Sequence, residues 1–255
     1  TGNFIKHLRK EHAGAMAKRT AAFVGKHFAG VCKTASKTLD AVDSLHKAVG
    51  TSFMKNGSHL LRTVTFGASP AWNRAMPKGG GPLPKVQPAP GNPRKVVYFP
   101  SCISRNMGPG REHDDTRTEP QVMISLLHKA GYDVIIPAGV EKLCCGMAFA
   151  SKGLTDQARK RELELSAALL TASNNGQYPV VSENGACLLH MKETLDSRLS
   201  LYEPVGFVMD VLREHLSFTV LPKTVAVHAT CSTRKMNLDA KLTGLASLCA
   251  ERVVV

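Results

Sequence analysis

The sequence lacks several features that would place it in a special class of protein. No apolar run reaches the roughly 18 residues that a membrane-spanning helix needs, and no basic-then-apolar secretory leader opens the chain. Phe, Trp and Tyr together make up 5% of the residues, with a single Trp. There is no Gly-rich phosphate loop and no nucleophile elbow. The apolar fraction of 43% is nevertheless that of an ordinary globular protein.

Acidic residues are scarce in one part of the chain. Residues 1–95 contain 16 Lys and Arg against 3 Asp and Glu, whereas residues 96–255 contain 17 of each, so the net charge of +13 belongs to the first part. A basic segment can dock on nucleic acid, on anionic lipid or on an acidic domain, or it can be a solvated surface. Nucleic acid is the least favoured partner, because the basic residues lack interleaved aromatics and a recognisable motif.

Residues 1–66 are predicted to be a basic helical segment, because apolar residues recur there every three or four positions. This stripe is rich in Ala and Val, which favours packing against protein over lying on a membrane. Residues 67–94 follow as a Pro- and Gly-rich linker that suits neither a helix nor a central strand. The stripe consists of Val24, Phe28, Val31, Ala35, Leu39, Val42, Leu45 and Val49.

From residue 95 onward, predicted strands and helices alternate. This alternation predicts an α/β fold with a mostly parallel sheet between layers of helices. Functional sites in such folds lie beyond the carboxyl ends of the strands. Strands are expected at 96–99, 133–136, 178–181 and 224–228, and helices at 121–130, 155–172, 186–194 and 204–216.

One short pattern occurs twice. Cys-x-x-Arg-x-Met occupies residues 102–107 and 231–236, each time directly after a predicted strand. We therefore expect two copies of one α/β unit. The first spans 95–222, and the second begins at 223 and is cut off at 255. Since the chain starts at Thr1, we expect it to be a piece of a longer protein.

The seven cysteines are odd in number and lack a secretory leader, so a disulfide framework explains them poorly. Cys102, the pair Cys144 and Cys145, and Cys187 each follow a predicted strand, so their thiolates can converge at one edge of the sheet. Such a set suits zinc or an iron–sulfur cluster. Adjacent cysteines favour the larger cluster, and Gly146 lets the backbone turn closely around it.

Two other readings of the cysteines remain open. Cys144 and Cys145 can instead be small buried hydrophobic residues, since cysteine thiols are often buried. Cys32 and Cys249 lie in helical patterns rather than on loops, and we predict a structural role for both.

Two runs of residues carry a resemblance to a known family. Residues 97–102 (VYFPSC) and 143–153 (LCCGMAFASKG) resemble the cysteine-rich CCG domain found in heterodisulfide reductase and in the iron–sulfur subunit of glycolate oxidase. They resemble more specifically the C-terminal part of FAD- and iron–sulfur-containing D-2-hydroxyacid dehydrogenases, of the D-lactate dehydrogenase (cytochrome) type. Residues 1–9 resemble the stretch after the ferredoxin-like module of those enzymes.

The resemblance implies an electron-transfer role. It implies that Cys102, Cys144, Cys145 and Cys187 bind a cluster, expected to be 4Fe-4S, and that Cys231 is the first ligand of a second site. It places FAD in a flavin domain outside this chain, which would be inactive alone. The expected partners are that domain, the ferredoxin-like module, and a cytochrome or quinone acceptor. The expected location is cytoplasmic, with peripheral contact at the inner membrane face as an option.

The sequence departs from the family pattern in two places. Asn184 stands where the usual repeat has a further cysteine, and the second Cys-Cys-Gly would fall beyond Val255. Alternatives therefore stay open: the iron–sulfur part of a D-2-hydroxyglutarate or glycolate dehydrogenase, or a non-catalytic docking module with a degenerate cysteine or zinc site.

Overall fold

The computed structural model describes residues 2–67, 69, 71–86, 88, 94–110 and 115–255. The chain divides into two compact units. The predicted boundaries at residues 66, 94 and 222 stay predictions, and linker residues 68, 70, 87 and 89–93 lie outside the described residues. Unit 1 comprises Thr1–Lys26, Lys85–Ser101 and Ile124–Val255, and unit 2 comprises His27–Pro84 and Cys102–Met123.

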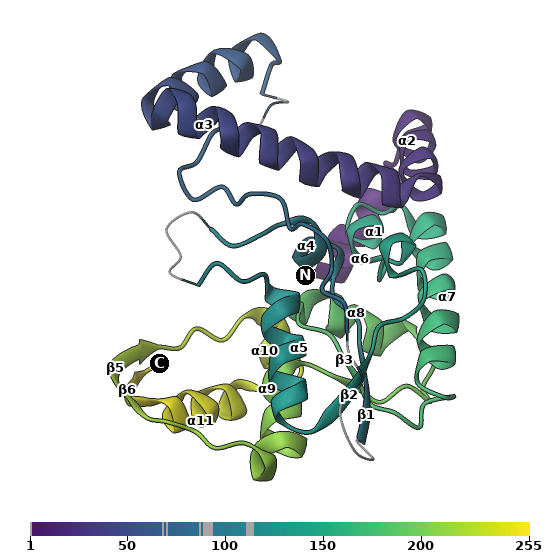
Figure 1. The fold of residues 1–255 in the computed structure, drawn as a ribbon. Coiled ribbons are helices and arrows are strands. Elements are labelled where there is room, and N and C mark those ends of the chain that lie inside the picture. The colour runs from purple at the N-terminus through teal and green to yellow at the C-terminus, as the bar shows by residue number, and fades with distance from the viewer. Residues whose placement is uncertain (1, 68, 70, 87, 89–93, 111–114) are drawn as a thin grey trace. The chain divides into compact units, whose positions relative to one another are not determined.

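Unit 1 contains a four-stranded sheet in the order β2-β1-β3-β4, in which every neighbouring pair is parallel (Figure 1). Val96 and Val97 in β1 and Val180 in β3 are completely buried, as expected for central strands covered on both faces. The predicted α/β fold with a parallel sheet is confirmed. The strands are β1 (Arg94–Tyr98), β2 (Tyr132–Ile135), β3 (Val180–Val181) and β4 (Leu201–Tyr202).

Helices of unit 1 follow the strands closely. The helix predicted at 155–172 is α7, and its Leu165 and Leu169 are completely buried. The helix predicted at 204–216 is instead broken into α9, a π turn and a 3-10 turn. The helices and turns that lie wholly in unit 1, up to β4 and the segment after it, are α1 (Gly2–Glu11), α2 (Ala15–Lys26), Val140–Lys142, α6 (Met147–Ala150), α7 (Thr155–Ala172), α8 (Gly185–Thr194), α9 (Pro204–Phe207), Val208–Leu212 and Arg213–His215.

The end of unit 1 forms a second, two-stranded parallel sheet. It pairs β5 (Leu221–Ala226) with β6 (Ala250–Val254), and α10 (Cys231–Lys235) and α11 (Asp239–Cys249) connect them. All six residues of β5 are exposed. The strand expected at 224–228 is thus found slightly earlier, whereas β6 was not predicted.

Unit 2 is built on one long helix, α3 (Phe28–Val64), which is interrupted at Gly50, whose φ of 79° and ψ of 169° are not helical. Of the predicted apolar stripe, Phe28 is 9% exposed, whereas Val31, Leu45 and Val49 are exposed. The unit also contains α4 (Cys102–Asn106). The helix α5 (Glu119–Lys129) begins in unit 2 and ends in unit 1.

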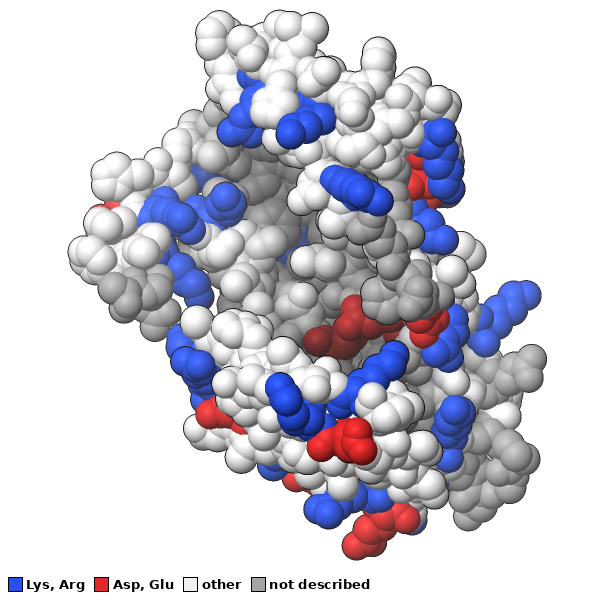
Figure 2. All heavy atoms as spheres, turned by 90° about the vertical axis from the view of Figure 1, so that its left-hand side faces the viewer, with Lys and Arg blue, Asp and Glu red and all other residues white. Residues whose placement is uncertain are grey.

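The charge of the chain is visible on its surface. Figure 2 shows Lys and Arg side chains spread over the face that is drawn, with Asp and Glu side chains among them. Among the described helices, none is both long enough and apolar enough to cross a membrane.

Candidate functional site

The Cys-Cys-Gly turn lies between β2 and α7 in unit 1. Cys144 and Cys145 are 2% and 4% exposed, and Gly146 turns the chain into α6 with φ of 87°. A Cβ on Gly146 would lie 2.8 Å from the carbonyl oxygen of Ala158 on α7, so both the backbone angle and the close approach favour glycine. The backbone N–H of Gly146 donates to the Cys144 Sγ at 3.5 Å.

Cys187 lies in the first turn of α8, just beyond β3. The residue that stands in place of a family cysteine, Asn184, is the N-cap of this helix, and its Oδ1 accepts a hydrogen bond from the Cys187 N–H at 3.1 Å. An Asn at this position satisfies one of the otherwise unbonded N–H groups of the helix. Asn184 therefore orients the backbone of Cys187 and supplies no thiol.

The structure brings three of the predicted thiols together within unit 1. The Cys145 thiol is hydrogen-bonded to both Cys144 and Cys187. The bond from Cys144 lowers the pKa of Cys145, but the bond to Cys187, burial and the charge of Cys187 outweigh it, so the net pKa is raised far above that of an ordinary thiol. All seven cysteines lie in the described part of the chain and remain thiols.

The other two predicted ligands lie elsewhere. Cys102 begins α4 in unit 2, and its joining the three thiols stays a prediction. The residue before it, Ser101, is in unit 1, where its N–H donates to Glu183 Oε1 at 2.8 Å and so connects the ends of β1 and β3. Cys231 is exposed at the start of α10.

The donor chemistry fits a thiophilic metal or cluster, since three thiols meet at a buried turn with a backbone N–H directed at one sulfur. In the part of the chain that the structure describes, however, no three His, Cys, Asp or Glu side chains are gathered so as to hold a single metal ion. The site is therefore a set of thiols in contact rather than a finished coordination sphere.

A buried ion pair that the sequence did not predict supports the site from behind. His190 Nε2 on α8 lies 3.0 Å from Glu162 Oε1 on α7, and both side chains are under a tenth exposed. Glu162 Cγ also lies 3.3 Å from the position of a Cβ on Gly146. The pair thus ties the helix that carries Cys187 to the helix that backs the Cys-Cys-Gly turn. Its one sequence signal is that His190 is one turn after Cys187.

A second cysteine environment lies in unit 2. Cys32 on α3 is half-buried, and Asn106, Cys102 and Arg105 of α4 are its neighbours. Burial raises the pKa of the Cys32 thiol, the hydrogen bond from Asn106 lowers it, and the charge of Cys102 raises it. Sequence reasoning gave Cys32 a purely structural role because the loop setting was missing, and nothing local to residue 32 signals its proximity to residue 102.

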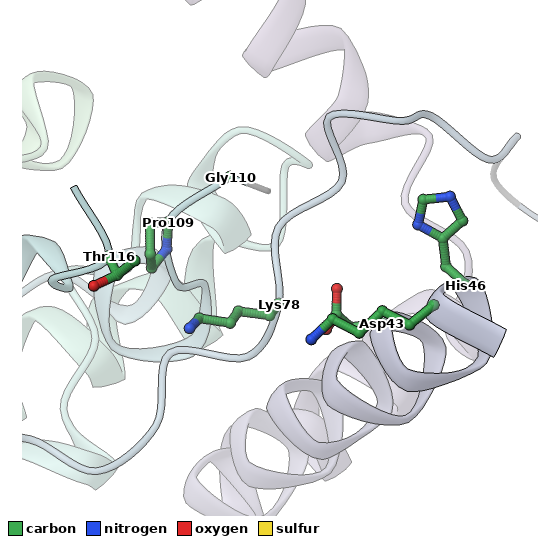
Figure 3. A pocket seen from close by; sticks show the side chains of 7 residues that line it. Asp43, His46, Lys78, Pro109, Gly110 and Thr116 are labelled. Carbon is green, nitrogen blue, oxygen red and sulfur yellow. The ribbon is translucent and has the colours of Figure 1, made fainter. Parts of the chain in front are cut away.

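Unit 2 also contains a cavity of about 350 Å³ that the sequence did not predict. Figure 3 shows Asp43 and His46 projecting into it from α3, with Lys78 between them and Thr116. Asp43 is buried and ion-paired with Lys47 at 2.8 Å. No cysteine lines this cavity, so it is separate from the thiol site.

Comparison with known families agrees with the cysteine arrangement. Residues 96–192 match the family model of the cysteine-rich domain, CCG. This match includes four of the five predicted ligands and ends before Cys231. No curated protein and no solved structure matches the chain. The segment 96–192 is therefore a CCG-type cysteine-rich domain.

Proposed function

We propose that this chain is the iron–sulfur electron-transfer portion of a flavin-dependent D-2-hydroxyacid dehydrogenase, with D-lactate as the substrate of the whole enzyme. The observation that carries the proposal is the group of Cys144, Cys145 and Cys187 thiols at the end of two parallel strands in a CCG domain. Substrate oxidation on FAD and the ferredoxin-like module belong to other parts of that enzyme, and a cytochrome or quinone accepts the electrons.

Four residues would hold the cluster: Cys102, Cys144, Cys145 and Cys187. A bound iron–sulfur cluster supplies one-electron transfer. The chain's own contribution is to provide thiolates, to exclude water and to direct hydrogen bonds at sulfur, all of which tune the reduction potential. Burial of the Cys-Cys pair and the N–H of Gly146 are the observed parts of that environment. Asn184 and the Glu162–His190 pair keep α8 in position.

Anaerobic reconstitution with iron and sulfide tests this proposal. We expect visible absorbance and protein-bound iron in the native chain, a large loss of both in Cys144→Ser, and no loss in Cys249→Ser, whose half-buried cysteine lies on α11. If the native chain binds no iron, or if both variants behave like it, the cluster proposal is wrong. Thermal unfolding of each variant separates a lost ligand from a lost fold.

One observation favours a second candidate function, a docking module with a degenerate cysteine or zinc site. Asn184 is used as a helix cap and not as a ligand, so unit 1 itself contributes three thiols. Three thiolates with a fourth ligand from outside suit zinc. Metal analysis of purified protein decides between the two: stoichiometric zinc with no iron after reconstitution favours the docking module.

A further inference from the structure

Two cysteines of unit 2, Cys32 and Cys102, lie on helices that are held against each other by a glycine-containing segment. The N–H of Gly79 donates to Asp40 Oδ1 on α3 at 2.9 Å. The N–H of the next residue, Gly80, donates to the carbonyl oxygen of Asn106 on α4 at 3.0 Å. Both glycines are buried, and one segment thus bonds to both helices.

This packing leaves no room for side chains on the connecting segment. A Cβ on Gly79 would lie 2.5 Å from the carbonyl oxygen of Ser36, and a Cβ on Gly80 would lie 2.3 Å from that of Arg105. Such distances are far below van der Waals contact, so the close approach depends on glycine. The positions of α3 and α4 are therefore fixed within unit 2 by backbone contacts.

The two cysteines face each other across this junction. Cys32 lies one turn before Ser36 and two turns before Asp40, so it shares their face of α3. On α4, the Asn106 amide donates to the carbonyl oxygen of Cys102 at 2.6 Å and also hydrogen-bonds the Cys32 thiol. One side chain therefore touches both cysteines, and both are half-buried, hence within reach of a small oxidant.

We propose that Cys32 and Cys102 are an oxidisable dithiol, a modification site that closes to a disulfide and withdraws the Cys102 sulfur from metal binding. The oxidant is a peroxide. One thiolate attacks a peroxide oxygen and becomes a sulfenic acid, and the second thiolate attacks that sulfur and displaces hydroxide. With H₂O₂, two thiols and one peroxide give one disulfide and two waters. The withdrawal of Cys102 rests on the proposed function, whereas the disulfide does not.

Thiol counting on the reduced, metal-free chain tests the disulfide. Treatment with a small excess of H₂O₂ should lower the titratable thiols by two from the initial seven, and dithiothreitol should restore them. Peptide mapping should show residues 32 and 102 in one cross-linked species, about 2 Da lighter than the sum of the two reduced peptides. Cys249→Ser should still form this species, whereas Cys32→Ser should not and should carry a sulfenic acid at Cys102.

The outcomes separate this inference from the cluster proposal. A cross-link between other cysteines, or no fall in thiol count, overturns the disulfide. If the chain oxidised beforehand binds as much iron as the reduced chain, the withdrawal of Cys102 is wrong. If neither form binds iron while the cross-link forms, the proposed function fails and the disulfide stands. Cys32→Ser should bind iron like the native chain, and its unfolding temperature shows whether it folds.

Discussion

The two places where Cys-x-x-Arg-x-Met follows a strand have opposite surroundings. The first strand, β1, is the centre of a four-stranded sheet, and Val96 and Val97 are completely buried. The second, β5, pairs only with β6, and every one of its residues is exposed. The same local pattern makes strand-then-helix in both places. The core that stabilises the first copy comes from elements distant in sequence, and the described residues provide no such cover for β5.

The largest expected effect comes from placing a charge in each strand. Val97→Asp should lower the free energy of unfolding by about 4 kcal/mol or more, because an unpaired carboxylate cannot be accommodated in a dry core. Val225→Asp in β5, where Val225 is 36% exposed, should cost less than about 1 kcal/mol. Urea unfolding measures both. Equal costs would show that β5 is as well covered as β1, contrary to this comparison.

A smaller contrast is expected between the two helix-to-helix ion pairs. Glu162→Gln breaks a buried pair with His190 and should cost about 1–3 kcal/mol. Asp210→Asn breaks a pair with Lys241 whose side chains are 42% and 39% exposed, and should cost under about 1 kcal/mol. Urea unfolding at low and high salt provides the check, since only the exposed pair is screened strongly. A salt-sensitive cost at Glu162 would contradict its burial.

The smallest effect concerns the two helix caps. Asn184→Ala removes the cap of α8 and should lower global stability by about 1 kcal/mol. Thr230→Ala removes the hydrogen bond from the Thr233 N–H at the start of the five-residue α10. It should change the global midpoint less, because an exposed short helix frays locally. Hydrogen exchange resolves the two: faster exchange across all of unit 1 in Thr230→Ala would sink this expectation.

Periodicity was sufficient to predict most elements of unit 1 because their signals are local. Thr155–Ala172 has a helical pattern without Gly or Pro, and the structure has it as α7 over the same range. The strand β6 escaped prediction because Ala250–Val254 contains charged residues and lies against α11 without a turn signal. The segment 204–216 was predicted as one helix, but a π turn interrupts it, and no residue there announces that change.

The candidate site was half predictable. Strand ends predicted that Cys144, Cys145 and Cys187 would meet, because the carboxyl ends of parallel strands share an edge. The roles of Glu162, His190 and Asn184 were not predictable, since an ion pair between α7 and α8 depends on how two helices pack and a cap depends on where a helix begins. The neighbours of Cys32 were missed for the same reason, as residues 32 and 102 are joined only by tertiary contacts.

The sequence by itself determined the α/β class, the strand-to-cysteine spacing and the uneven charge, because each is a property of neighbouring residues. Only the tertiary structure decided which thiols contact one another, that Gly146 is confined by the Ala158 carbonyl, and that one copy of the repeated pattern is buried while the other is exposed. The physical reason is that burial and close approach are set by packing between distant elements, which no local pattern encodes.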